Sequence, residues 1–203
     1  MVGGGWARIV AGVQRRIVRR TRVVVLRATP LLEPFELPDG CTLVRIDRDA
    51  GGDQQRAERA MQAVGEPAGL VAARLAHGDQ FVAWQQDGEI VSFGWVRGRE
   101  RRIGPVRLLD APGRYFVYNF QTRADCRGRR LYPALLLAVR DLFGRDGARE
   151  FFGEVNVHNI ASMRGIERAG FVPVGGVSYL TLADRWMLGA RTAPRDPSAA
   201  CPF

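Results

Sequence analysis

The chain has 203 residues and a hydrophobic fraction of 46%, enough for one domain with a full core. Its three cysteines show no CxxC spacing, which excludes a disulfide framework or a zinc cluster, and the absence of lysine excludes P-loop and Schiff-base chemistry. Seven of the nine excess positive charges precede the first acid, Glu33, so the rest of the chain is nearly balanced and no nucleic-acid partner is expected.

A basic amphipathic helix is predicted over residues 6–22, because apolar residues follow one helical stripe and arginines lie on the other side. Two interpretations stay open: peripheral contact with an anionic membrane surface, or a solvated helix that packs on its own domain. The run at 22–27 indicates a strand, and a turn-rich segment follows it. Residues 1–40 are therefore assigned to a basic N-terminal helix or arm and a linker.

No apolar run reaches the roughly 20 residues of a membrane span, and the N-terminus lacks the unbroken apolar segment of a signal peptide. We therefore expect a cytoplasmic protein. Binding of the N-terminal helix to lipid would place it at the inner face of the membrane.

From Cys41 the hydrophobic pattern becomes regular, and strands and helices follow in a mixed α/β order. The Asp87-Gly88 pair between two alternating runs predicts a hairpin turn. The predicted strands cover 41–46, 80–86, 89–98, 115–122, 150–157 and two strands within 171–188 that are separated by a Gly-Gly break. The predicted helices cover 53–64, 68–76, a segment from Leu131 to Gly144, and a segment between Asn159 and Gly170. The domain is expected to span 41–188, with a flexible tail over 189–203.

An anion site is predicted where the strand at 115–122 leads into the next helix. Three arginines and Gly128 precede the helix start. Exposed amides at a helix N-terminus, a glycine that permits close backbone approach and several guanidinium groups together suit a pyrophosphate. A solvated basic turn is the alternative.

Asn159 is predicted to cap the following helix, because its side-chain oxygen can accept a hydrogen bond from an amide in the first helical turn. Gly170 is predicted to close the same helix in a left-handed conformation, and Phe171 returns the chain to the core. These features require no function by themselves.

The two segments resemble the GNAT superfamily of N-acetyltransferases, whose coenzyme A loop reads Arg/Gln-x-x-Gly-x-Gly/Ala. Arg127 occupies the first position of this loop, whereas Arg130 and Tyr132 replace its two small residues. Residues 155–171, VNVHNIASMRGIERAGF, are similar to the family's second signature, a strand followed by Asn-x-x-Ser/Ala and a helix that ends in Gly-Phe.

The resemblance implies an α/β fold of the mixed, α+β type, with a central twisted sheet of six to seven strands and about four helices. The fourth and fifth strands, 115–122 and 150–157, would splay apart. The implied reaction is transfer of an acetyl group from acetyl-CoA, or of another acyl group from its acyl-CoA, to the primary amine of a small molecule. No metal is implied. The residues implied to hold the cofactor are Phe120, Gln121, Thr122, Arg127, Gly128, Arg129, Arg130, Leu131, Tyr132, Asn159 and Ser162.

Deprotonation of the incoming amine requires a base. Glu154 is the first candidate, because strand alternation places it on one face with Asn156 and His158; a solvated or ion-paired carboxylate is the alternative. Tyr118 and Asn119 lie centrally on the fourth strand and are expected to point to opposite faces, one of them toward the cleft.

The family frequently takes the acid for the departing thiolate from a tyrosine four residues before the final glycine. Ile166 holds that position and cannot donate a proton, so a water, the thiolate itself or another tyrosine would have to serve, with Tyr132 and Tyr179 as the candidates. Two other functions stay open: an acyl-CoA-binding or regulatory module without turnover, and a membrane-surface-associated protein that uses its arginine-rich N-terminus.

Overall fold

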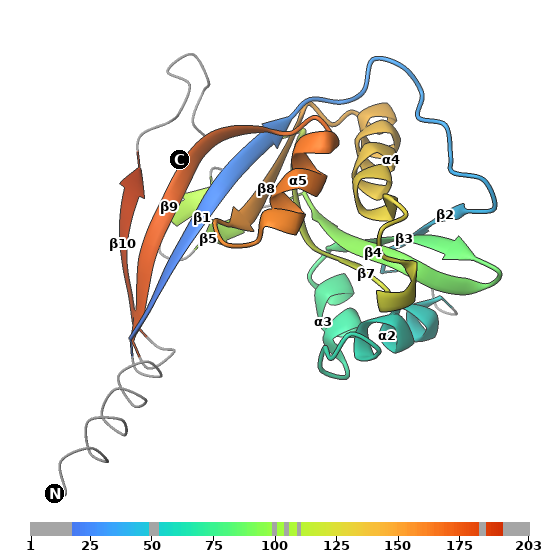
Figure 1. Ribbon diagram of the computed structural model, residues 1–203, viewed down its shortest axis with the longest axis horizontal. Helices are drawn as coiled ribbons and strands as arrows, with labels where there is room; N and C mark the ends of the chain where they lie inside the picture. Colours follow the sequence, from blue (N-terminus) through green and yellow to red (C-terminus); the bar gives the residue numbers. More distant parts are fainter. Residues whose placement is uncertain are drawn as a thin grey trace, which may run out of the picture.

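The computed structural model describes residues 18–48, 53–98, 101–103, 106–108, 111–182 and 186–192. A mixed eight-stranded sheet carries helices on both of its faces (Figure 1). The helix that we expected over 6–22 lies outside the described residues up to residue 17, and residues 18–22 form part of a strand instead.

The strands lie in the order β10-β9-β1-β8-β7-β4-β3-β2. Neighbouring strands are antiparallel, except that β7 and β8 are parallel. The strands of the sheet are β1 (Val18–Ala28), β2 (Thr42–Ile46), β3 (Gln80–Gln86), β4 (Glu89–Arg97), β7 (Arg114–Thr122), β8 (Glu150–Asn156), β9 (Val172–Leu182) and β10 (Trp186–Thr192). A separate hairpin consists of β5 (Arg101–Ile103) and β6 (Val106–Leu108).

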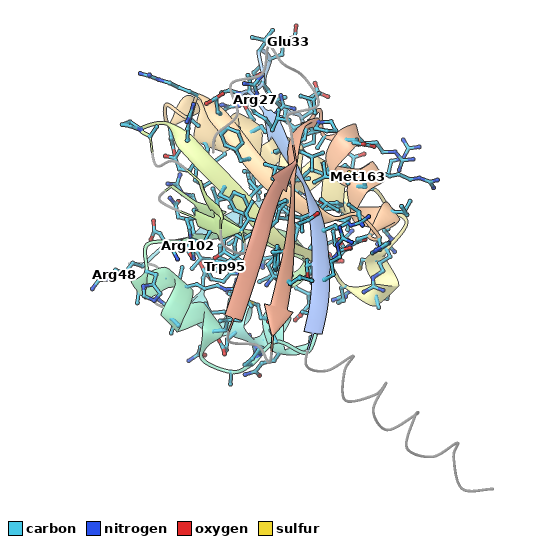
Figure 2. All side chains as sticks on the ribbon, turned by 90° about the vertical axis from the view of Figure 1, so that its left-hand side faces the viewer. Arg27, Glu33, Arg48, Trp95, Arg102 and Met163 are labelled. Carbon is cyan, nitrogen blue, oxygen red and sulfur yellow. The ribbon has the colours of Figure 1, made fainter. Side chains whose placement is uncertain are left out.

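The mixed α/β fold that we predicted is confirmed, with one more strand in the sheet than expected. The additional strand is β1, which contains the strand predicted at 22–27 and pairs with β8 on one side and with β9 on the other. Figure 2 shows β10, β9 and β1 side by side at this end of the sheet. The prediction assigned residues 1–40 to an arm and linker, and it was wrong for β1, which lies inside the sheet. Its run of apolar residues is explained by burial on both faces, since Val25 and Leu26 are both 0% exposed and belong to different core clusters.

The last two strands also differ from the prediction. β9 continues through the Gly175-Gly176 pair, which pairs with Val25 and Val24 of β1, so the pair is not a break. The register with β1 shifts at the neighbouring Val174. β10 then extends to Thr192, beyond the expected end of the domain at residue 188.

In the part of the chain that the structure describes, helices cover both faces of the sheet (Figure 1). Helices α4 (Leu131–Arg145) and α5 (Ile160–Arg168) pack on one face, and α2 (Gln54–Gln62) and α3 (Leu70–Ala76) on the other. Alternation along β3 illustrates the two layers: Val82 packs in the cluster of α4 and α5, whereas Phe81 and Ala83 pack with α2 and α3. The layers bury the strands that carry the site.

The predicted splay between the fourth and fifth strands is present. β7 and β8 pair only from Arg114 to Val117 and from Glu150 to Gly153. Beyond these residues β7 remains paired with β4 as far as Thr122, while β8 remains paired with β1 as far as Asn156. The two strands therefore separate toward their C-terminal ends, each held by its outer neighbour.

A buried arginine ties α4 to the rest of this layer. Arg140 is 8% exposed, and its Nε donates to the main-chain oxygen of Thr29 at 2.7 Å. Its Nη1 donates to the main-chain oxygen of Ala169 at 2.5 Å, at the C-terminal end of α5. The arginine thus joins α4, α5 and the end of β1, and burial lowers the pKa of its guanidinium from its ordinary value.

Arg140→Met should lower the free energy of unfolding by about 1–3 kcal/mol, because two carbonyl oxygens lose their donor. Urea denaturation measures this change. Arg145→Met is the matched control, since Arg145 is exposed on the same helix and pairs with Asp141 at i,i+4; its effect should stay within about 0.5 kcal/mol. Equal losses in the two variants would contradict the assigned role of Arg140.

Candidate active site

A cleft of about 200 Å³ lies where β7 and β8 separate. Its walls come from β7, β8, α4 and α5, and its apolar lining consists of Val117, Phe120, Leu136 and Ile166. Eight of the residues that the sequence singles out line it together: Tyr118, Asn119, Phe120, Gln121, Tyr132, Glu154, Asn159 and Ser162. The site therefore combines residues from two strands and from the two helices that follow them in the chain.

The remaining predicted cofactor residues lie outside the lining of this cleft. Thr122 turns toward β4, where its Oγ1 lies 3.0 Å from the hydroxyl of Ser92. The other five, residues 127–131, form the turn before α4 and its first residue. This turn begins after a short 3-10 helix (Ala124–Cys126).

The backbone of this turn leaves main-chain donors available. Gly128 has φ +82° and Arg130 has φ +59°, both in the left-handed region. In the part of the chain that the structure describes, the four amides from Arg129 to Tyr132 have no hydrogen-bond acceptor, as expected for the first turn of a helix. A Cβ on Gly128 would have no atom within 4 Å, so the backbone faces open space.

The charge around the turn matches these donors. The side chains of Arg127, Arg129 and Arg130 are all exposed, and Arg127 donates from Nε to the main-chain oxygen of Thr122 at 3.3 Å. Free amides, the positive end of the helix dipole and three guanidinium groups suit a phosphate or pyrophosphate anion. The replacement of two small residues by Arg130 and Tyr132 does not fill the space over Gly128.

Asn159 caps α5 as predicted: its side-chain oxygen accepts a hydrogen bond from the amide of Ser162 at 3.1 Å. Ser162 in turn lies beside Tyr132, with 3.3 Å between the two hydroxyl oxygens. The ring of Tyr132 rests directly on Gly165 of α5, where a Cβ would come within 2.3 Å of it. A glycine inside this helix therefore admits the tyrosine to the wall of the cleft.

Burial raises the pKa of the Tyr132 hydroxyl, and the hydrogen bond with Ser162 lowers it to a smaller extent. Tyr132 therefore keeps its proton at neutral pH and remains a donor. Ile166, in the position of the family's tyrosine, is 2% exposed and lines the same cleft.

Tyr118 and Asn119 do not point to opposite faces as expected. Asn119 has φ +50°, and the pairing of β7 with β4 shifts its register there. This bulge interrupts the alternation. The hydroxyl of Tyr118 donates to Asp79 at 2.7 Å and the side-chain amide of Asn119 donates to Glu66 at 3.0 Å, so both side chains reach residues on the α2–α3 side of the sheet.

Asp79 fixes Tyr118 in place. Its side chain is 0% exposed, and it also accepts a hydrogen bond from Nε of Arg97 at 2.7 Å. Burial, and then the hydrogen bond with Asp79, raise the pKa of Tyr118 far above its ordinary value of 10.0. Tyr118 therefore stays protonated and cannot serve as a base near neutral pH.

Glu154 is half-buried on β8, lines the cleft and lies opposite Val25 of β1 in the strand register. The expected alignment of Glu154 with His158 is wrong, because β8 ends at Asn156. The side-chain oxygen of Asn156 accepts the amide of His158 at 3.0 Å, and the chain turns there. Glu154 is thus the carboxylate that the strand itself presents to the cleft.

Sequence analysis missed Glu66, Asp79 and Arg97, the residues that hold Tyr118 and Asn119. Glu66 lies in the connection between α2 and α3, and Asp79 lies just before β3. Their partners are 53 and 39 residues away in the chain, so no local pattern indicates the contacts.

Tyr118→Phe should change how stability depends on pH. The unfolded tyrosine loses its proton near pH 10, whereas the folded one retains it to higher pH, so alkali favours the unfolded state above about pH 10. The free energy of unfolding of the wild type should therefore decline more steeply than that of the variant above this pH. Urea midpoints measured from neutral pH to about pH 11 test this; parallel declines would contradict it.

This chain is similar in fold to several solved structures. No protein-family model and no curated protein match the chain. Among solved structures, a protein from Novosphingobium aromaticivorans assigned to the GNAT family of acetyltransferases is similar, with a TM-score of 0.57, 20% identity, and coverage of 82% of this chain and 66% of that one. A GCN5-related N-acetyltransferase from Sphaerobacter thermophilus has a TM-score of 0.57 at 19% identity over 92% of this chain and 57% of its own.

A third similar structure is a GCN5-related N-acetyltransferase from Kribbella flavida, with a TM-score of 0.55, 19% identity, and coverage of 88% of this chain and 64% of that one. The chain thus spans about 57% to 66% of the length of these three proteins. None of the described helices is long and apolar enough to cross a membrane. The described part of the chain has the fold of the GNAT acetyltransferases.

Proposed function

We propose that this protein is an acyl-CoA-dependent N-acyltransferase that transfers the acetyl group of acetyl-CoA to the primary amine of a small molecule. The proposal rests on one observation: an anion site and a cleft lie next to each other along β7. The unpaired amides at the start of α4 provide an anion site, and the cleft that contains Glu154 opens beside the same strand.

The residues present suit coenzyme A. The amides from Arg129 to Tyr132, with the exposed arginines of the turn, are suited to hold its pyrophosphate. In the described sheet β7 has no strand partner toward β8 beyond Val117, so its main-chain groups there are suited to bind the amides of the pantetheine arm. Asn159 lies at the same cleft and retains its side-chain NH₂ for that arm. Acetyl-CoA would supply an acetyl group activated as a thioester.

In the proposed reaction Glu154 accepts the proton of the acceptor's ammonium group on its carboxylate. Tyr132 lies on the α4–α5 side of the cleft, and its hydroxyl stays protonated at neutral pH. Its hydroxyl proton is our candidate for transfer to the departing thiolate. Ile166 excludes water from this wall without contributing a proton. Tyr118, engaged with Asp79, and Asn119, engaged with Glu66, shape the acceptor side.

Two measurements together test the function. A thermal-shift series with coenzyme A and acyl-CoAs of increasing chain length tests binding, because a ligand that binds only the folded protein raises its melting temperature. Thiol release from acetyl-CoA with a panel of small amines tests turnover. Binding without amine-dependent thiol release would favour the acyl-CoA-binding module, and absence of binding would overturn both interpretations.

Gly128→Val should weaken coenzyme A binding at least about tenfold, because a branched side chain would obstruct approach of phosphate to the backbone and disfavours positive φ. Calorimetric titration with coenzyme A measures this. Gly147→Val is the matched control: Gly147 also has positive φ and open surroundings, but it follows the C-terminal end of α4. Equal affinity of the two variants would remove the Gly128 turn from the binding site.

Glu154→Gln should lower turnover by about 100-fold or more, the usual contribution of a general base, while coenzyme A affinity stays unchanged. Amine-dependent thiol release and titration with coenzyme A measure the two effects separately. Glu167→Gln, at an exposed position on α5, is the control for a charge change nearby. Full activity of Glu154→Gln would exclude Glu154 as the base.

A further inference from the structure

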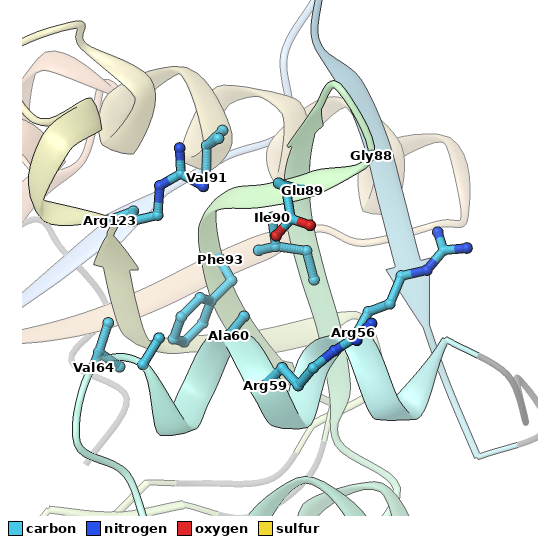
Figure 3. A pocket seen from close by; sticks show the side chains of 11 residues that line it. Arg56, Arg59, Ala60, Val64, Gly88, Glu89, Ile90, Val91, Phe93 and Arg123 are labelled. Carbon is cyan, nitrogen blue, oxygen red and sulfur yellow. The ribbon is translucent and has the colours of Figure 1, made fainter.

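A second cavity, of about 170 Å³, lies between α2 and the β3–β4 hairpin (Figure 3). Ala60 of α2, Val64 in the turn after that helix, and Ile90 and Phe93 of β4 give it an apolar lining. Phe93 is 3% exposed and stacks on Phe81 in the core beneath, so this wall is rigid. No residue that lines this cavity also lines the cleft between β7 and β8.

Charged side chains surround this apolar lining. Arg56 and Arg59 lie one turn apart on α2, and Arg123, just after β7, lines the cavity on the side opposite Arg56 (Figure 3). Glu89, in the hairpin, also lines the cavity. The lining itself contains three guanidinium groups and one carboxylate, and two further carboxylates, Asp53 and Asp125, lie beside Arg56 and Arg123.

The positive charge of these arginines is only partly neutralised. Arg123 is held by a hydrogen bond from Nε to Asp125 at 2.7 Å and by its main-chain amide, which donates to Val91 at 3.0 Å. Arg56 reaches Asp53 only at 3.6 Å. Arg59 has no acidic partner within the described residues. One guanidinium is thus fixed in position, and another is available for an anion.

We infer that this cavity binds a small carboxylate that carries a branched or aromatic apolar group. Guanidinium groups suit a planar carboxylate, and the apolar lining beside them suits the rest of such a ligand. The volume lies below the roughly 300–1,000 Å³ of sites for drug-sized ligands, which restricts the ligand to the size of a simple organic acid. The site is independent of the proposed acyl transfer, since it shares no lining residue with the cleft.

Nuclear magnetic resonance titration of the isotope-labelled full chain with phenylacetate and isovalerate tests this inference. Saturable shifts are expected at the amides of Gly88 and Glu89, with much weaker effects of the neutral phenylacetamide and of acetate. Arg59→Gln should weaken phenylacetate binding by about threefold, as is typical of an exposed ion pair. Glu89→Gln should strengthen it, because the variant removes the repelling carboxylate.

Arg145→Gln, an exposed position on the opposite face of the sheet, is the control and should leave phenylacetate affinity unchanged. Equal binding of phenylacetate and phenylacetamide, or of wild type and Arg59→Gln, would overturn the inference. Shifts confined to residues 127–132 would do so as well, because they would place the anion at the start of α4. Coenzyme A affinity of Arg59→Gln should equal that of the wild type, which separates this site from the proposed catalytic one.

Discussion

The parallel pairing of β7 with β8 stops after Val117 and Gly153, and the candidate site exists because it stops there. Each strand continues beyond that point because its outer neighbour still holds it: β4 pairs with β7 as far as Thr122, and β1 pairs with β8 as far as Asn156. The main-chain groups that a continuous sheet would have paired are thereby turned toward a cleft. A polar cleft between two strands of the sheet results.

The β8 wall of this cleft depends on a strand from the far N-terminal part of the chain. β1 fills the place between β8 and β9, and Arg140 fixes the end of that strand to α4 and α5. The position of Glu154 therefore follows from its pairing with Val25. The candidate base and the N-terminal strand form one structural unit.

Local chemistry accounts for what could be predicted from sequence. The Asn159 cap follows from an oxygen and an amide three residues apart, and the hairpin at Asp87-Gly88 follows from the residues of the turn itself. The splay and the pyrophosphate turn were expected because two motifs resemble a known family, and only the splay is visible without a ligand.

The errors share a different physical origin, since each depends on distant segments. Whether the apolar run of β1 lies in an arm or inside the sheet depends on strands more than 100 residues away. The bulge at Asn119 depends on the register with β4, and the engagement of Tyr118 depends on Asp79, which lies 39 residues away in the chain. No periodicity within a single segment records such contacts.

The contact between Tyr132 and Gly165 has a consequence for how this sequence can change. Because the ring occupies the space that any Cβ at position 165 would need, Gly165 cannot be exchanged for a larger residue while the tyrosine ring keeps this position. A bulkier residue at position 165 becomes acceptable only after the tyrosine has been replaced by a small residue. The evolutionary histories of these two positions should therefore be coupled, with bulk at one accompanied by its absence at the other.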